Sequence, residues 1–236
     1  TEQETINRLL VEKALRGKTV VRLKGGDPFV LGRGGEEAEA LAMHHVPFEV
    51  VPGVSSALAV PAYAGIPLTH RGLASSFAVV TGHEAVDKNE QTIVWDKLSA
   101  GADTLLFLMG VGNLRYIVSR LLENGRLPST PVAIIANGTS HRQHTISGTL
   151  DNIVSRAEQE NLQPPAVIVV GEVVRLREHL RWFDNRPLFG KRILVTRTKQ
   201  LASQMSHLLL KRGAVPIEMP TIEIETLPVP DGFDQA

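Results

Sequence analysis

The sequence TVVRLKGGDPFVLGRGGEE occupies residues 19–37 and joins a β-branched run to two glycine-rich segments. The run Thr19 to Leu23 predicts a strand, and this strand ends on the loop Lys24-Gly25-Gly26-Asp27-Pro28. The following helix is expected from Gly35 to about His44. A strand that runs into a glycine-rich loop and then into a helix is typical of α/β folds.

The next segment repeats this order. Val46 to Val51 predicts a second strand, which ends on Pro52-Gly53. Ser55 or Ser56 can cap the helix that starts with Ala57, because a serine hydroxyl accepts a hydrogen bond from the first backbone N–H groups of a helix. The chain is therefore expected to alternate strand and helix units.

Farther along, short runs rich in valine and isoleucine keep alternating with longer helical patterns. The clearest helix starts at Leu114 and ends at Asn124-Gly125, since its apolar residues fall on one face. We expect strands over residues 76–81, 104–108, 131–136, 143–147 and 166–170, a helix near 150–160 and an amphipathic segment over 174–183.

A polar stretch with a proline, Asp184-Asn185-Arg186-Pro187, indicates a domain boundary. After it, residues 191–196 predict a strand, Leu201 to Gly213 a helix, and Val215 to Glu225 another strand. These elements form one βαβ unit, and about 46 residues fall short of a normal domain size. We therefore expect the natural chain to continue beyond Ala236.

The composition excludes several classes of function. The 236 residues carry a formal net charge of zero, so no strong positive field attracts nucleic acid or an anionic membrane. The chain has no cysteine, which excludes disulfides and thiolate chemistry and is compatible with the cytoplasm. No signal peptide is readable, and prolines and glycines interrupt the apolar stretch Val50 to Leu68. A small-molecule partner is expected.

Two arginines in loops are candidate ligands for an anion. Arg33 lies among glycines, whereas Glu36 and Glu37 have a structural interpretation as acids in the first turn of a helix. Arg71 lies in a loop that also contains Gly72. A guanidinium binds a carboxylate through two parallel hydrogen bonds and stays charged, so these arginines suggest a substrate with several carboxylates. An ordinary surface position is the alternative for each.

Other candidates follow predicted strands. Gly25-Gly26-Asp27 can bring backbone N–H groups and a carboxylate to a ligand, although a plain tight turn is the commoner explanation of such a cluster. Met109 and Asn137-Gly138-Thr139 can approach a ligand or serve core packing. Ser55-Ser56 favour helix capping or ligand contact, because no nucleophile elbow accompanies them. No histidine spacing indicates a metal site.

Taken together, these motifs resemble one family. Val21 to Phe29 followed by Gly32 to Glu37 is very similar to the uroporphyrinogen-III C-methyltransferases, which are tetrapyrrole methylases. The resemblance covers roughly residues 1–183. It continues through Val51 to Ala57, Gly65 to Arg71, Val80 to His83, Met109-Gly110 and Asn137 to Thr139.

The resemblance implies the tetrapyrrole methylase fold, with two α/β/α subdomains at residues 1–78 and 79–184, a homodimer, and S-adenosylmethionine in the cleft between the subdomains. The family's opening strand and another glycine-rich loop, with an acidic residue and a lysine proposed for catalysis, would precede Thr1. The resemblance therefore implies that the first subdomain is incomplete here. It also implies that activity depends on residues upstream of Thr1.

Carried over position by position, the resemblance also implies site residues and a reaction. Arg33, Glu36 and Arg71 correspond to tetrapyrrole contacts, and Arg33 is implied to assist deprotonation. The implied reaction is attack by an electron-rich pyrrole carbon on the sulfonium methyl of S-adenosylmethionine. It takes place twice, each time with a new cofactor molecule, and gives precorrin-2 and S-adenosylhomocysteine. The implied cofactor contacts are Gly25, Gly26, Asp27, Val30, Ser55, Ser56, Met109 and Gly138.

The end of the chain resembles a second family. Leu188 to Arg197 is similar to the start of uroporphyrinogen-III synthase, a lyase. Residues 185–190 would then be a linker and residues 191–236 the start of a synthase-like domain in a bifunctional protein of sirohaem or cobalamin biosynthesis.

Two other interpretations stay open. Another tetrapyrrole methylase of the cobalamin pathway would share the fold and the cofactor, although the run Gly32 to Glu37 favours the first assignment. The second interpretation comes from a different functional class: the chain is a catalytically incomplete fragment that acts only as a folded, dimerising module.

Overall fold

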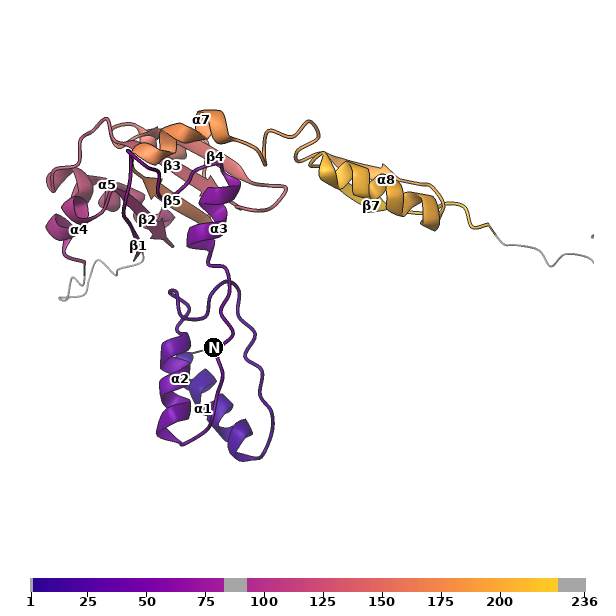
Figure 1. The fold of residues 1–236 in the computed structure, drawn as a ribbon, viewed down its shortest axis with the longest axis horizontal. Helices are drawn as coiled ribbons and strands as arrows, with labels where there is room; N and C mark the ends of the chain where they lie inside the picture. Colours follow the sequence, from indigo (N-terminus) through magenta and orange to yellow (C-terminus); the bar gives the residue numbers. More distant parts are fainter. Residues whose placement is uncertain (1, 83–92, 225–236) are drawn as a thin grey trace, which may run out of the picture.

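The computed structural model describes residues 2–82 and 93–224 (Figure 1). His83, in one of the motifs, and Glu225, at the end of the last predicted strand, lie outside these residues.

A mixed five-stranded sheet has the strand order β1-β2-β5-β3-β4. β1 (Phe77–Thr81) and β2 (Thr104–Leu108) are parallel. β5 (Ala166–Val170) pairs antiparallel with β2 and β3 (Pro131–Ala136), and β4 (His144–Thr149) pairs antiparallel with β3. All five strands coincide closely with the runs that predict them, and the α/β class is confirmed.

Helices cover both faces of this sheet (Figure 1). Successive side chains of a strand point to opposite faces, and β2 is apolar on both, so each face needs a covering layer. Leu105 and Phe107 join one apolar cluster, together with residues of α4 (Trp95–Gly101), α5 (Leu114–Glu123) and α6 (Ile153–Gln159). α5 begins after the short 3₁₀ helix η1, Val111–Asn113.

The opposite face carries the helix that follows the second glycine-containing loop. Leu106 and Leu108 pack there with apolar residues of α3 (Ser56–Tyr63) and of the 3₁₀ helix η2 (Glu172–Leu176). η2 leads into α7 (Arg177–Leu180). α3 is thus fixed to the sheet, which determines where the loop before it lies.

The N-terminal part contains helices but no sheet among the described residues. α1 (Gln3–Leu15) packs on α2 (Gly34–Met43). Residues 19–23 and 46–51 are extended, but no described strand pairs with either, and Val21 is 83% exposed. A β-branched run becomes a strand only where a neighbour accepts its backbone hydrogen bonds. The two predicted strands are therefore wrong for this structure.

A separate βαβ unit follows at the C-terminal end (Figure 1). β6 (Arg192–Val195) and β7 (Val215–Glu218) form a parallel pair, and α8 (Lys199–Lys211) connects them and packs on both. This is the predicted unit, with a last strand that ends earlier than expected.

The stretch before this unit makes contacts on both sides. The ring centroid of Phe183 lies 4.7 Å from that of Tyr63 in α3 and 5.3 Å from that of Phe189. The Arg186 guanidinium lies 4.3 Å from the centroid of the Phe183 ring. The predicted boundary at 184 and linker at 185–190 stay predictions, and the stretch itself is packed.

Candidate functional site

The two glycine-containing loops meet through Asp27. One oxygen of its carboxylate accepts a hydrogen bond from the Phe29 N–H at 2.8 Å, and the other accepts from the Gly53 N–H at 3.2 Å. These backbone donors hold the pKa of Asp27 below its ordinary value. A Cβ atom at Gly53 would overlap the carbonyl oxygen of Gly26. The loops therefore touch backbone to backbone.

The joined loops lie at the first turn of α3. Ser55 is buried, and its hydroxyl accepts a hydrogen bond from the Ala57 N–H at 3.2 Å, which confirms it as the cap; Ser56 is the first helical residue. A Cβ atom at Gly26 would lie 3.7 Å from the Cα atom of Ser55. The structure thus brings Gly26, Asp27, Ser55 and Ser56 together.

Gly138, in the turn that follows β3, approaches the same helix. A Cβ atom at Gly138 would lie 2.5 Å from Cγ1 of Val60, so only glycine allows this approach. Val60 is one helical turn beyond Ser56, about 6 Å along the axis. Met109 has a φ of 57° and is 56% exposed directly after Leu108, which packs in the α3 cluster. Gly26, Asp27, Ser55, Ser56 and Gly138 therefore lie around the first half of α3, and Met109 follows a residue that packs there.

Gly25 and Val30 lie on either side of Asp27, and both are exposed. A Cβ atom at Gly25 would meet no atom within 4 Å, so the backbone at this point borders open space.

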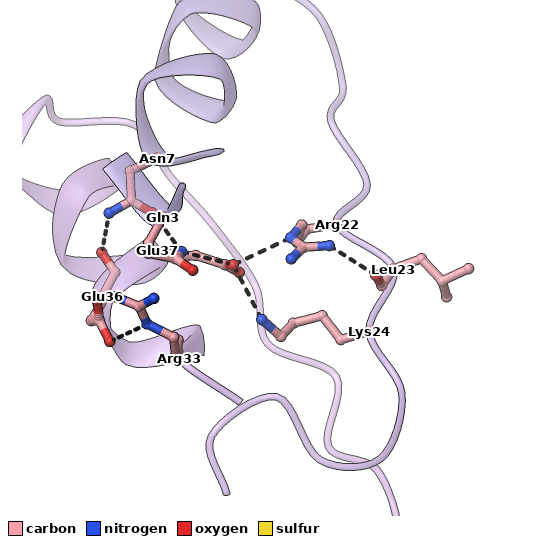
Figure 2. A network of polar contacts seen from close by, with 8 residues as sticks. All are labelled: Gln3, Asn7, Arg22, Leu23, Lys24, Arg33, Glu36 and Glu37. Atoms are coloured by element: carbon pink, nitrogen blue, oxygen red, sulfur yellow. Dashed lines mark hydrogen bonds and ion pairs between the residues drawn. The ribbon is translucent and has the colours of Figure 1, made fainter. Parts of the chain in front are cut away.

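Arg33 is engaged by its neighbour on α2 (Figure 2). Its Nε and Nη2 atoms donate to the two carboxylate oxygens of Glu36 at 2.8 and 2.7 Å. The hydrogen bonds that Arg33 donates to Glu36 raise the pKa of Arg33 and lower the pKa of Glu36. This electrostatic arrangement keeps the guanidinium protonated and opposes the predicted role of Arg33 in deprotonation. A role as a cation for the substrate stays a prediction.

Glu37 lies in the first turn of α2, as predicted, but the sequence did not indicate its contacts with other segments. Its Oε1 atom accepts from Gln3 Nε2 at 3.1 Å, Arg22 Nε at 3.2 Å and Lys24 Nζ at 3.1 Å (Figure 2). Burial alone would raise the pKa of Glu37, but these donors outweigh it and lower the pKa. The available signal was the spacing of Arg22 and Lys24, which places both cations on one side of an extended chain.

Arg71 lies in an exposed turn closed by the hydrogen bond from the His70 N–H to the Ala74 carbonyl oxygen at 2.8 Å. Asp103 holds the end of this turn, since one carboxylate oxygen accepts from the backbone and hydroxyl groups of Ser75 and Ser76. Two guanidinium groups carry the same charge and only donors, so a contact between Arg71 and Arg33 would need an anion between them. A shared anionic pocket stays a prediction.

Other features of the described residues do not add to this site. No group of three or more histidine, aspartate or glutamate side chains there is arranged to hold a metal ion. No described helix has the length and apolar content to cross a membrane. A groove of about 460 Å³ between η1, α5 and α6 contains none of the predicted site residues.

The chain matches the family model of the tetrapyrrole (corrin/porphyrin) methylases over residues 1–154, which include every candidate site residue. It belongs to this family. Over 176 residues it is 58% identical to the uroporphyrinogen-III C-methyltransferase of Methanocaldococcus jannaschii, covering 74% of this chain and 72% of that methylase.

Longer and structurally known family members extend the comparison. A uroporphyrinogen-III C-methyltransferase of Bacillus subtilis is 46% identical over 97% of this chain, which spans only 47% of that relative, about half its length. The crystal structure of the Thermus thermophilus uroporphyrin-III C-methyltransferase with S-adenosylhomocysteine is 41% identical, with a TM-score of 0.64 over 74% of this chain and 75% of that one.

Proposed function

We propose that this tetrapyrrole methylase transfers methyl groups from S-adenosylmethionine to two carbon atoms of uroporphyrinogen III, giving precorrin-2 and S-adenosylhomocysteine. The observation that carries the proposal is the junction of the Gly26-Asp27 and Gly53 loops at the first turn of α3. The names of the relatives, and the ligand in the Thermus thermophilus structure, support this choice of substrate and cofactor.

The residues at this junction suit S-adenosylmethionine, which supplies an electrophilic methyl group on a positively charged sulfur. Gly25 borders open space, so a ligand can approach the backbone there. The first N–H groups of α3 can donate to a carboxylate. The Asp27 carboxylate complements a cation, and the exposed Met109 side chain offers an apolar contact.

Arg33 and Arg71 are proposed to bind the carboxylates of the tetrapyrrole. Glu36 occupies the Nε–Nη2 edge of the Arg33 guanidinium and orients it. Nη1 makes no hydrogen bond with a described residue, so the Nη1–Nη2 edge can bind a substrate carboxylate through two parallel hydrogen bonds. In this proposal Arg33 stabilises and positions charge and removes no proton.

We further propose a homodimer in the cytoplasm, and a synthase-like domain that starts at β6 of a bifunctional protein in sirohaem or cobalamin biosynthesis. The parallel βαβ unit of β6, α8 and β7 supports the start of a new domain. The Bacillus subtilis relative matches 97% of this chain and is about twice as long, which supports a unit that belongs to a longer protein.

The test measures cofactor binding and turnover in the purified full-length protein. Isothermal titration calorimetry is expected to show S-adenosylhomocysteine binding, and an anaerobic assay to show two methyl transfers to uroporphyrinogen III. Absence of cofactor binding would overturn the proposal. Methylation of a later cobalamin intermediate but not of uroporphyrinogen III would assign the chain to another step of the same chemistry.

A further inference from the structure

Glu37 connects three segments that are separate in the sequence. It is the fourth residue of α2, is 5% exposed, and accepts hydrogen bonds from Gln3 on α1 and from Arg22 and Lys24 before the first glycine loop (Figure 2). Two cations converge on one buried carboxylate oxygen. Removing that carboxylate would leave both without their shared partner.

We propose that Glu37 is a positioning residue for the cofactor loop, which it places by holding Arg22 and Lys24 on α2. This inference rests on the proposed function, because it takes Gly25, Gly26 and Asp27 as the loop that contacts the cofactor. Glu37 itself touches neither cofactor nor substrate in this proposal.

The first argument is that Arg22 and Lys24 attach residues 19–24 to α2 through Glu37. No described strand pairs with this segment. Its side chains alternate: Arg22 and Lys24 contact Glu37, whereas Val21 and Leu23 are 83% and 86% exposed. In an extended chain such alternation puts every second residue on the same side. The segment is therefore fixed on the Glu37 side.

The second argument is the short distance along the chain from Lys24 to the loop junction. Lys24 directly precedes Gly25, and Asp27 binds the Gly53 N–H three residues after Lys24. An extended chain advances about 3.3 Å per residue, so Lys24 and Asp27 are at most about 10 Å apart. A displacement of Lys24 therefore acts on the contact between the two loops.

The neighbouring acid, Glu36, contacts a different cation. Glu36 bonds Arg33 on the exposed side of α2, at the position proposed for the tetrapyrrole. Two adjacent glutamates thus serve different ligands: Glu37 acts through Lys24 on the cofactor loop, and Glu36 through Arg33 on the substrate. A change at Glu37 is therefore expected to alter the KM for S-adenosylmethionine without altering the KM for uroporphyrinogen III.

The test compares Glu37→Gln with Glu39→Gln, a matched control with the same charge change at an exposed position of α2. Glu37→Gln is expected to weaken S-adenosylhomocysteine binding about tenfold or more, because a shift of about 1 Å can cost ~100-fold in function. The KM for S-adenosylmethionine should rise while that for uroporphyrinogen III stays unchanged. Faster amide exchange at residues 22–30 should accompany these changes, with the β1–β5 sheet unaffected.

Because Glu37→Gln leaves two cations unpaired, the double variant Glu37→Gln/Lys24→Met provides a second test that removes an acid and a base together. Weak cofactor binding by this folded double variant would support the inference. Binding and exchange equal to those of Glu39→Gln, in either variant, would overturn it. If the unaltered protein binds no S-adenosylhomocysteine, the proposed function fails, and amide exchange at residues 22–30 still decides whether Glu37 positions the loop.

Discussion

Gly53 and Gly26 meet with no space for a side chain between them: a Cβ atom at Gly53 would overlap the Gly26 carbonyl oxygen. The contact joins two loops that lie 26 residues apart at Asp27 and Gly53. Since backbone atoms cannot move aside as a flexible side chain can, the position of one loop determines that of the other.

Gly53→Ala is therefore expected to separate the loops. Overpacking of this kind costs about 1–3 kcal/mol, and the loss of the Asp27 hydrogen bond should weaken cofactor binding. The comparison is Gly35→Ala, because a Cβ atom at Gly35 in α2 would meet nothing within 4 Å. Chemical denaturation and calorimetry with S-adenosylhomocysteine should show a loss for Gly53→Ala and a neutral or slightly stabilising effect for Gly35→Ala. Equal stability and equal cofactor affinity of the two variants would contradict the close contact between the two loops.

Arg33→Lys keeps the charge but loses the planar fork that Glu36 orients. We expect a large fall in turnover of uroporphyrinogen III with little change in S-adenosylhomocysteine affinity, measured by anaerobic kinetics and calorimetry. Unchanged turnover would remove Arg33 from the site.

Gly138→Ala tests whether Gly138 acts through packing. The added methyl group would collide with Val60 and push α3 away from β3. Gly138→Ala should lower both stability and cofactor affinity, and the double variant Gly138→Ala/Val60→Ala should recover part of both, because it removes the colliding methyl groups. Failure of the second substitution to rescue binding would point to direct ligand contact by Gly138.

Asp184→Asn should destabilise the packing of α7 beside α3. Asp184 accepts hydrogen bonds from Arg177 at 2.6 Å and Arg181 at 2.8 Å, and Arg177 is largely buried and also donates to the Ala64 carbonyl oxygen. Removing one partner of a buried pair costs roughly 3 kcal/mol. Glu172→Gln, which breaks the exposed pair with Arg175, should cost ~0.5 kcal/mol or less. Thermal unfolding distinguishes the two; similar shifts in Tm would contradict this ranking.

The ion pairs of Asp184 also predict that the protein loses stability at acidic pH. Burial alone would raise the pKa of Asp184, but Arg177 and Arg181 outweigh it and hold the pKa below its ordinary value of about 3.9. The stabilisation is therefore complete above about pH 4 and is lost as the pH falls through the folded-state pKa. Unfolding measured from pH 6 to 2 should show this loss in the unaltered protein and a weaker dependence in Asp184→Asn.

Local sequence patterns predicted correctly the elements that are strongly apolar or that depend on neighbouring residues. Residues 104–108 form a strand as expected, since an apolar run on both faces is stable only between two covering layers. Ser55 caps α3 as one of two predicted options, because capping depends on neighbouring residues alone. The family motif likewise lies within consecutive residues.

Interactions between distant residues were decided by the tertiary structure. Residues 19–23 have the composition of a strand, yet a strand needs a partner that composition cannot supply. Glu37 suited a helix dipole by its position, but folding placed it against Lys24 and Arg22. The sequence by itself thus determined the α/β class, the cap and the loops around Gly26 and Gly53. Only the tertiary structure decided which backbones and charges meet, because those contacts depend on how segments far apart in the chain pack.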